Sequence, residues 1–375
     1  MKLRLIALVA GGALLLAALG GAGWIISLPP APQAVEAPTI PDGETRTMMA
    51  ALKPPKRDRP VVAIIGINDA TETTDYLMPA GILRRAGVAD VMLLATEPGV
   101  VKLYPALTVQ PDATIAAFDA QHPDGADYVI VPAMSRENDP RVLAWIRAQA
   151  DKGAVIVGVC IGAKVVANTG LLDGKRATTH WFARDAMLKE HPDIIYTPNR
   201  RIVADEGVAT TTGITASMPL ALTLVEAIAG REKASGVARE LGLGDWDARH
   251  ASDAFRFNRD FALTVIGNSM QVWAKAEMGL QLRPGMDEVS LALTADAWSR
   301  TYRSRAVTFA EGEQTSLNGV RIVPDRADWA DERRLTAMDA GPPAQVLDLT
   351  LQQIAAYYGQ PTADVVAMQL EYPKR

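Results

Sequence analysis

The feature that most constrains the fold is a buried strand that ends in a tight turn around the only cysteine of the chain. Residues 155–159 read VIVGV, an apolar run that predicts a strand buried on both faces of a parallel sheet. A helical pattern begins just after Cys160, and glycines stand two positions before and after it, at Gly158 and Gly162. This spacing is typical of a strand-to-helix elbow, which lifts the side chain at its tip away from the sheet. Cys160 is therefore the candidate nucleophile.

The same turn predicts how the thiol is activated. The thiolate is the reactive form, and the ordinary cysteine pKa of about 8.5 leaves little of it at neutral pH. A helix that starts directly after Cys160 is expected to lower this pKa through its dipole and its free N–H groups. The N–H groups of Ile161 and Gly162 are candidate donors to an oxyanion. The alternative is that a lone cysteine simply packs as a small hydrophobic residue.

Strands alternate with helices from residue 60 onward. We predict strands at 61–67, 90–95, 127–131, 155–159 and 208–212, helices at 71–85, 140–152 and 215–229, and a hairpin at 100–109. This alternation indicates a mostly parallel sheet covered by helices on both faces. Ligands bind such sheets at the carboxyl ends of the strands, where Cys160 would lie.

The pattern changes after about residue 230. We predict two or three helices over 231–280, a strand at 288–294, and a strand with a hairpin at 304–324. The last segment resembles residues 88–111, which predicts an incomplete internal repeat that carries no cysteine. A chance likeness between two strand–hairpin units is the open alternative.

Residues 1–28 predict a transmembrane signal anchor. Lys2 and Arg4 precede an uncharged apolar run over 5–28 that ends near Trp24, and about 20 such residues span a bilayer. The charge order places the bulk of the chain outside the cytoplasm, in a periplasm, tethered to the inner membrane. A cleaved signal peptide is the alternative, with a cleavage site at residues 35–37. The proline-rich residues 29–59 predict an extended linker.

Composition excludes several classes of function. A net charge of -5 argues against a nucleic-acid partner, because binding nucleic acid needs a basic face. A single cysteine excludes an intramolecular disulfide and a cysteine-based metal cluster. The four histidines show no metal-binding spacing, so we expect no metal and no cofactor. His122, His191 and His250 lie in polar stretches of the sequence and are expected to face solvent.

Residues 60–235 resemble the ThiJ/PfpI superfamily, which has the class I glutamine amidotransferase-like fold. The similarity is carried by GVCIGA at 158–163 with NTGLLDGKRATTHW at 168–181, and by DYLMP at 75–79 with RRAG at 84–87. Within the superfamily, these motifs are most similar to isonitrile hydratases and to the N-terminal domains of AraC-type regulators. The resemblance implies a flavodoxin-like, doubly wound sheet, with residues 236–375 forming a smaller α/β region outside it.

The resemblance also implies the partners of the cysteine. It places Asp75 beside Cys160 as a general acid or base, and it turns His180 toward the same pocket as a proton carrier. Asp75 could instead only cap a helix, and His180 could be a hydrogen-bonded structural residue. Many members carry two glycines after the fourth strand, whereas this chain has Ala133 and Met134, whose N–H groups would have to complete the oxyanion site.

The function implied is a cysteine-dependent hydratase or hydrolase for an isonitrile, an amide or a reactive carbonyl. The alternative is a non-catalytic module that binds a small ligand or senses oxidants. Ile161 stands where peptidase members have histidine, which argues against a peptidase. A transcription regulator is disfavoured because no helix-turn-helix pattern follows the domain and the chain is acidic. The family's tendency to dimerise implies that a homodimer is compatible with this chain.

Overall fold

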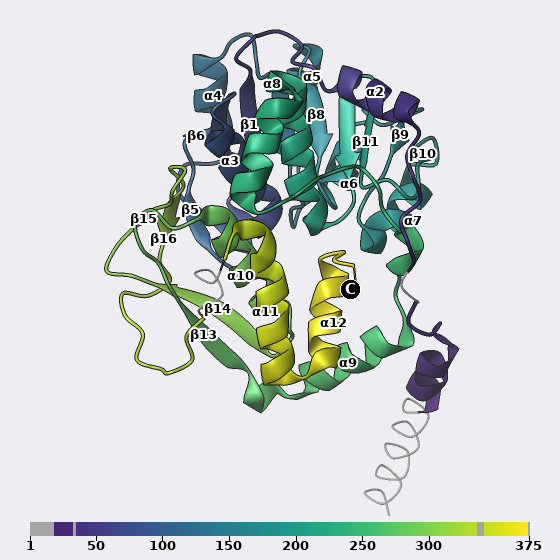
Figure 1. Cartoon of the computed structure of the whole chain (residues 1–375), viewed down its shortest axis with the longest axis vertical. Helices are drawn as coiled ribbons and strands as arrows, with labels where there is room; N and C mark the ends of the chain where they lie inside the picture. Colours follow the sequence, from purple (N-terminus) through teal and green to yellow (C-terminus); the bar gives the residue numbers. More distant parts are fainter. Residues whose placement is uncertain (1–18, 33–34, 336–340, 374–375) are drawn as a thin grey trace, which may run out of the picture.

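The computed structural model describes residues 19–32, 35–335 and 341–373, and a seven-stranded sheet forms the centre of this part of the chain (Figure 1). The strand order is β11-β12-β8-β7-β1-β3-β6. All neighbouring strands are parallel except β11, which is antiparallel to β12. The strands are β1 (Val61–Gly66), β3 (Asp90–Ala95), β6 (Ala113–Thr114), β7 (Tyr128–Val131), β8 (Val155–Gly158), β11 (Ile202–Asp205) and β12 (Val208–Thr211). Taken in chain order, β1, β3, β7, β8 and β12 have the flavodoxin-like arrangement 2-1-3-4-5, as predicted.

Helices cover both faces of this sheet. Side chains of β1 alternate between two hydrophobic clusters, with Val62 and Ile64 in one and Ala63 and Ile65 in the other. The first cluster lies under α3 (Thr73–Ala86) and α8 (Ser217–Leu241), and the second under α4 (Ile115–Gln121), α5 (Pro140–Asp151), α6 (Gly162–Ala167) and α7 (Trp181–Glu190). Two short strands, β9 (Arg176–Ala177) and β10 (Ile195–Tyr196), pair beside the main sheet.

The predicted linker is not an extended spacer. It contains α2 (Asp42–Ala51), which packs against β11 and α8 because Met48 and the following Leu52 are buried in the core. The Tyr128 hydroxyl donates to the Leu52 carbonyl at 2.6 Å, and Arg57 pairs with buried Asp127. The folded unit therefore begins before residue 60.

Most of the predicted membrane span lies outside the described residues. Residues 19–27 of it are helical. Among the described ranges, no helix is both long enough and apolar enough to cross a bilayer.

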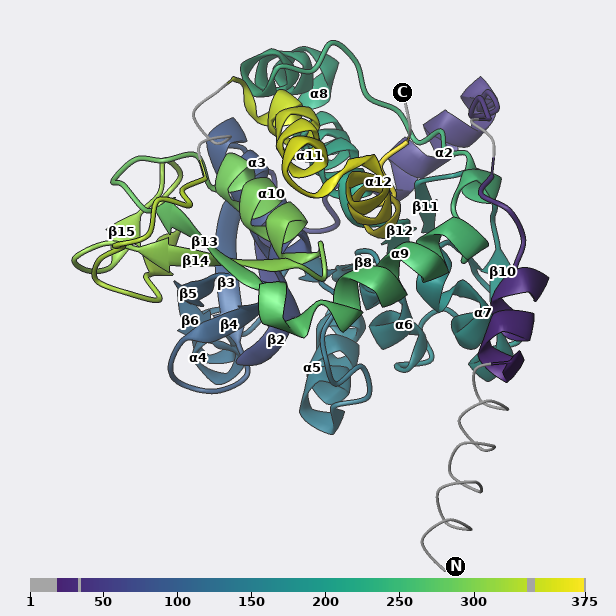
Figure 2. The same ribbon diagram turned by 90° about the horizontal axis from the view of Figure 1, so that it is seen from below.

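The C-terminal region adds a second α/β layer. Its elements are α9 (Arg259–Met270), β13 (Ala276–Gln281), α10 (Glu288–Ser299), β14 (Ser304–Phe309), β15 (Gln314–Thr315), β16 (Arg321–Val323), α11 (Pro343–Tyr358) and α12 (Gln360–Gln369). Figure 2 shows α10 beside α3 and α11, with α12 next to α11. A five-stranded sheet, β15-β16-β5-β4-β2, joins this region to β2 (Asp69–Glu72), β4 (Val101–Tyr104) and β5 (Thr108–Gln110).

The strand predicted at 288–294 is wrong, because these residues open helix α10. The Asp287 side chain accepts a hydrogen bond from the Ser290 N–H and so caps the helix. The residues that follow are alanine, leucine and other good helix formers. Nearly all of α10 is buried, so its sequence lacks the polar face that would have marked a helix period.

Candidate active site

Cys160 stands at the tip of a strained elbow between β8 and α6. Its φ is 58°, in the left-handed region that few non-glycine residues adopt, and only 3% of its surface is exposed. A Cβ on Gly158 would lie 2.7 Å from the Ala163 Cα, and one on Gly162 would lie 1.9 Å from the Val131 carbonyl oxygen. Both glycines are needed for the close approach of the turn, so the elbow has the predicted shape.

Two buried carboxyl groups lie at the start of α3. Glu72 caps the helix, since its Oε2 accepts from the Asp75 N–H at 2.6 Å and from the Thr74 hydroxyl at 2.9 Å. Asp75 is fully buried, and its Oδ2 accepts from the Ala133 N–H at 3.1 Å. Its Oδ1 is buried with no hydrogen-bond partner among the described residues. Asp75 is thus not the helix cap, and one of its oxygens is left for another partner.

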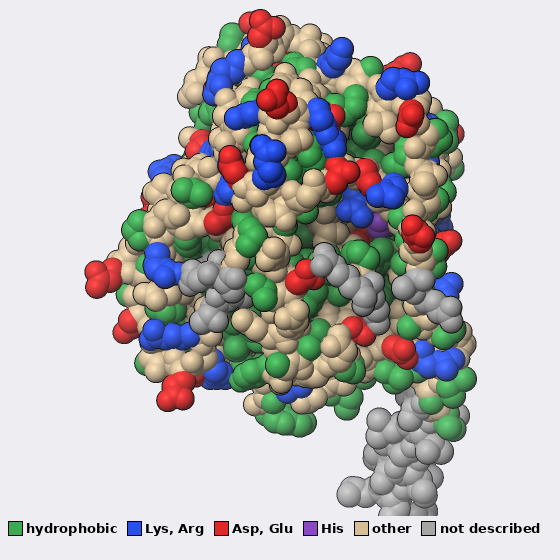
Figure 3. All heavy atoms as spheres, viewed as in Figure 1, with side chains coloured by type: hydrophobic (Ala, Val, Ile, Leu, Met, Phe, Trp, Pro, Cys, Tyr) green, Lys and Arg blue, Asp and Glu red, His purple; other side chains and the backbone are tan. Residues whose placement is uncertain are grey.

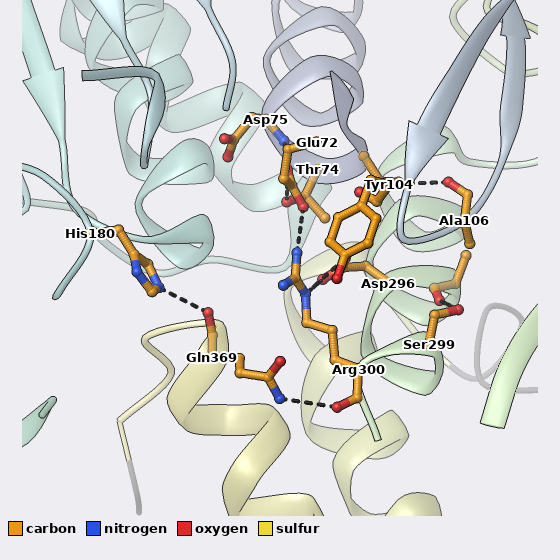
Figure 4. Close-up of polar contacts among 12 residues, drawn as sticks. Glu72, Thr74, Asp75, Tyr104, Ala106, His180, Asp296, Ser299, Arg300 and Gln369 are labelled. Carbon is orange, nitrogen blue, oxygen red and sulfur yellow. Dashed lines mark hydrogen bonds and ion pairs between the residues drawn. The ribbon is translucent and has the colours of Figure 1, made fainter. Parts of the chain in front are cut away.

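An arginine from the C-terminal region completes this cluster. Arg300 follows α10, and its Nη2 lies 2.9 Å from Glu72 Oε1 while its Nε lies 2.8 Å from Asp296 Oδ2 (Figure 4). The Tyr104 ring lies beside the guanidinium, at 5.9 Å. The sequence prediction missed Arg300 and Asp296 because it placed everything after residue 235 outside the site. Glu72 gave no standard capping signal, because glutamate is not among the preferred N-cap residues.

The thiol is a weaker acid than the sequence predicted. Burial raises the pKa of Cys160 well above its ordinary value, and the nearby carboxyl groups of Asp75, Glu72 and Glu371 raise it further. A hydrogen bond from the Ile161 N–H opposes this rise. The predicted lowering is present in the bond from Ile161, which stands at the start of α6, but burial outweighs it, so the net shift is opposite to the predicted one.

The carboxyl groups of Glu72 and Asp75 both have raised pKa values. Burial raises the pKa of Glu72 to about 7, with Asp296 adding to the rise and Arg300 opposing it. Burial and the neighbouring Glu72 raise the pKa of Asp75 well above its ordinary value. Adjacent carboxyl groups that cannot both ionise share protons. The cluster around Cys160 can therefore accept or release a proton near neutral pH.

The predicted oxyanion donors are partly occupied. The Gly162 N–H donates to the Val159 carbonyl at 2.7 Å, and the Ala133 N–H donates to Asp75. The backbone of Met134 pairs with Thr71 in an isolated bridge. Of the four predicted donors, the Ile161 N–H is the one directed at the sulfur.

His180 has a structural environment. It caps α7, where Nδ1 accepts from the Phe182 N–H at 3.1 Å, and this leaves Nε2 to donate to the Gln369 carbonyl at 3.0 Å (Figure 4). Burial lowers its pKa, so the neutral ring is favoured. Both nitrogens have partners other than the sulfur, which favours the structural alternative; its role as a proton carrier stays a prediction.

The C-terminal latch, residues 368–373, is bound to the segments that follow His180 and Thr212. Glu371 Oε1 accepts from the Trp181 N–H and Oε2 from the Gly213 N–H, both at 2.6 Å. The Thr215 hydroxyl donates to the Glu371 carbonyl at 2.8 Å. Only 2% of the surface of Glu371 is exposed. No sequence signal pointed to this residue, because its partners lie about 160 to 190 positions away.

A pocket of about 570 Å³ lies on the other side of the latch. Its walls include Phe255, Phe261 and Met368, and its polar groups include Arg201 and His250 together with Glu371. Figure 3 looks onto this face, where a histidine side chain (purple) shows in a hollow beside Lys or Arg side chains (blue). The prediction that His250 faces solvent is wrong, because its ring stacks on Phe255 and is 5% exposed.

Comparisons with known proteins agree with this architecture. Residues 61–227 match the DJ-1/PfpI family. Isonitrile hydratase from Pseudomonas putida is 38% identical over 104 residues, which is 28% of this chain and 44% of that protein. The Parkinson disease protein 7 homolog from Danio rerio is 28% identical over 190 residues, covering 49% of this chain and 97% of its own length. The HTH-type transcriptional regulator CdhR from Pseudomonas aeruginosa is 35% identical over 105 residues, covering 28% and 31%.

Among solved structures, Drosophila melanogaster DJ-1beta aligns with a TM-score of 0.45 at 24% identity, over 49% of this chain and 98% of its own. The match covers less than half of the length of the isonitrile hydratase and of the regulator CdhR. The match of residues 61–227 to the DJ-1/PfpI family agrees with the family resemblance of the sequence motifs for that part of the chain.

Proposed function

We propose that the DJ-1/PfpI domain uses Cys160 as a nucleophile toward a small electrophilic carbon, in a hydratase or hydrolase reaction on an isonitrile, an amide or a reactive carbonyl. The observation that carries the proposal is the strained left-handed backbone of Cys160, held at the tip of the elbow beside two buried carboxyl groups. Backbone strain of this kind persists only where the surrounding structure imposes it, and it gathers at active sites. A cysteine that merely fills space needs neither the strain nor the acids.

The chemistry must begin from a protonated thiol. Because the pKa of Cys160 is raised, its proton has to leave as the sulfur–carbon bond forms. When the carboxyl pair of Asp75 and Glu72 holds one negative charge, Asp75 has the unpaired oxygen that can take this proton, and the pair becomes neutral. The electron pair of the carbon–heteroatom π bond moves onto the heteroatom, or onto the terminal carbon of an isonitrile. With an isonitrile, the carboxyl pair returns the proton to that carbon, and water converts the resulting thioimidate to a formamide and the free thiol. With an amide, the proton goes to the nitrogen, the amine leaves, and water cleaves the thioester to an acid and the free thiol. With an aldehyde, the proton goes to the oxygen and the product is a hemithioacetal, which forms reversibly.

The second candidate function is a ligand-binding module without catalysis. The pocket beyond the latch favours it, because that pocket is lined by apolar groups and Arg201 but not by Cys160. Oxidant sensing is the weaker form of this alternative. Cysteine oxidation requires thiolate character and exposure, whereas Cys160 is buried and its pKa is raised.

The test is a turnover screen of isonitriles, amides and α-oxoaldehydes with the wild type, Cys160→Ala and Asp75→Asn. We expect Cys160→Ala to abolish turnover and Asp75→Asn to lower kcat by about 10²- to 10⁴-fold, the usual contribution of a positioned acid or base. Mass spectrometry of the quenched wild type should show a substrate adduct on the peptide that contains Cys160. Turnover that survives in Cys160→Ala refutes the nucleophile. Tight binding that is equal in all three proteins, without turnover, selects the binding module.

A further inference from the structure

The C-terminal region repeats the first strand–helix–strand unit of the domain. β1, α3 and β3 correspond to β13, α10 and β14, and in each unit the two strands are parallel neighbours over six residues. The left-handed backbone positions also correspond. Ala70 (φ 57°) and Gly285 (φ 73°) precede the two helices, and Gly87 (φ 66°) and Tyr302 (φ 61°) end them. Both pairs are separated by 215 positions, so the likeness extends well beyond the short hairpin similarity seen in the sequence.

The contacts between the two units are reciprocal. Where a residue of the first unit contacts a residue of the second, their counterparts 215 positions away make the equivalent contact. Glu72 caps α3 and binds Arg300, which follows α10. Asp287 caps α10 and binds Arg85 at the end of α3. Each acid and each arginine is 215 positions from its counterpart. An exchange in which residue i meets j and the equivalent of j meets the equivalent of i is the signature of an isologous, twofold interface.

The hairpins obey the same symmetry. Strands β5 and β16 pair antiparallel, with Val109 directly opposite Ile322 and equivalent neighbours on either side. In each unit an aspartate just after the hairpin accepts an N–H from the second strand of the unit, Asp112 from Leu93 and Asp325 from Thr308. The axis relating the two units therefore passes beside the pair of Val109 and Ile322.

Only the first of the two related units carries the candidate reactive side chains. Ser290 occupies the position of Asp75 in the second unit, and the only cysteine belongs to the first. The ion pair of Glu72 with Arg300 adjoins the Cys160 cluster, and the charge of Arg300 couples to the thiol. The ion pair of Arg85 with Asp287 is its counterpart on the side without a cysteine.

We propose that residues 276–326 act as a built-in partner subunit: they close the twofold face of the domain within one chain and supply Arg300 as the positioning residue for Glu72 in the Cys160 site. A second chain then has no access to this face. The homodimer that the family resemblance suggested would have to use another surface. The proposal rests on Cys160 being the reactive group, but its tests need no substrate.

The first test follows the pH dependence of Cys160 alkylation by iodoacetamide in Arg300→Gln, with Arg85→Gln as the symmetry-matched control. We expect the wild-type profile to show an inflection near pH 7 from Glu72. Removing the Arg300 charge should move this inflection upward by about one pH unit or more. The Arg85→Gln profile should coincide with that of the wild type.

Arg300→Lys keeps the charge but cannot bond two carboxyl groups through one planar fork. It is expected to move the inflection in the same direction by less, and it serves as the test if Arg300→Gln does not fold. An unmoved inflection in the folded Arg300 variants, or an equal shift in Arg85→Gln, overturns the positioning role.

The second test places cysteines at Val109 and Ile322 in a Cys160→Ser background. Directly opposed antiparallel residues have Cα separations of about 4.5–5.5 Å, which suit a disulfide. After oxidation we expect a cross-link within one chain, seen as a faster-migrating monomer in non-reducing gels and a monomer mass in sedimentation. A cross-link between chains, or none with both thiols free in the folded protein, overturns the built-in partner. The single variant Val109→Cys is the control for random pairing.

Discussion

The latch makes a quantitative prediction for Glu371→Gln. In the wild type both carboxylate oxygens of Glu371 accept short N–H bonds, from Trp181 and from Gly213. Glutamine keeps the shape of the side chain but has one acceptor oxygen, so one of the two buried N–H groups faces an NH₂ group. The substitution therefore weakens the attachment of residues 368–373 without opening a cavity.

The magnitude follows from those two bonds. Losing one charge-assisted bond and leaving its buried donor unpaired costs about 2–3 kcal/mol. If the latch must open before a reagent reaches Cys160, the open population rises by the same free energy. Because about 1.4 kcal/mol is a factor of ten, native-state alkylation of Cys160 should accelerate by roughly 30- to 150-fold.

The assay is the rate of iodoacetamide modification under native conditions, followed by intact mass, with the free energy of unfolding measured in urea. Asp127→Asn is the matched control. Asp127 is fully buried and accepts from the N–H groups of Val61 and Arg57, at the start of β7, away from the latch. We expect both variants to lose stability and only Glu371→Gln to gain reactivity. If Glu371→Gln is destabilised as expected but alkylates at the wild-type rate, the latch does not gate Cys160.

Three further outcomes are expected. Gly162→Ala should lose more than about 3 kcal/mol in urea unfolding, because its Cβ would lie 1.9 Å from the Val131 carbonyl oxygen, and a stability near wild type contradicts the elbow geometry. Gly81→Ala should lose about 1–3 kcal/mol, since its Cβ would lie 2.4 Å from Glu288 Oε1, although glycine to alanine in a helix normally stabilises; a gain in melting temperature would show that α3 and α10 pack less closely. The pKa of Glu72 is raised from 4.5 to about 7, so the folded chain binds that proton more tightly: the stabilisation is full below pH 4.5 and is lost as the pH rises through 7. The free energy of unfolding in urea should fall by up to about 3 kcal/mol as the pH rises through this window, and Glu72→Gln should remove this pH dependence. If the variant keeps the wild-type pH dependence, the proton belongs to another group.

The first domain could be predicted because its signals are local. The strand predicted at 90–95 is β3 itself, and Asp139 caps α5 with hydrogen bonds to two backbone N–H groups. Cys160 was found because an elbow needs small residues at fixed offsets, which a sequence displays directly. Asp75 was found through the family motif, and the structure supplies the reason that Glu72, not Asp75, caps the helix.

The other half of the site could not be read in the same way, because it depends on contacts between distant segments. Arg300 binds Glu72 across 228 positions, and Glu371 binds the Trp181 N–H across 190. The prediction of a strand at 288–294 also concealed the extent of the repeat. Had those residues been read as a helix, the order strand, helix, strand, hairpin would have matched residues 61–110, and Arg300 would have aligned with Arg85.

The direction of the Cys160 pKa shift shows that the groups packed around the elbow, and not the turn alone, determine how acidic the thiol is. Considered alone, the turn and the following helix predict a thiolate. In the folded chain the same sulfur is buried near the carboxyl groups of Asp75, Glu72 and Glu371, and its pKa rises. In the proposed reaction, the raised pKa keeps Cys160 protonated at rest, and the sulfur becomes a nucleophile when a substrate reaches the site and Asp75 takes its proton. The C-terminal region would then act on Cys160 twice, through the access tested at Glu371 and through the charge that Arg300 holds beside Glu72.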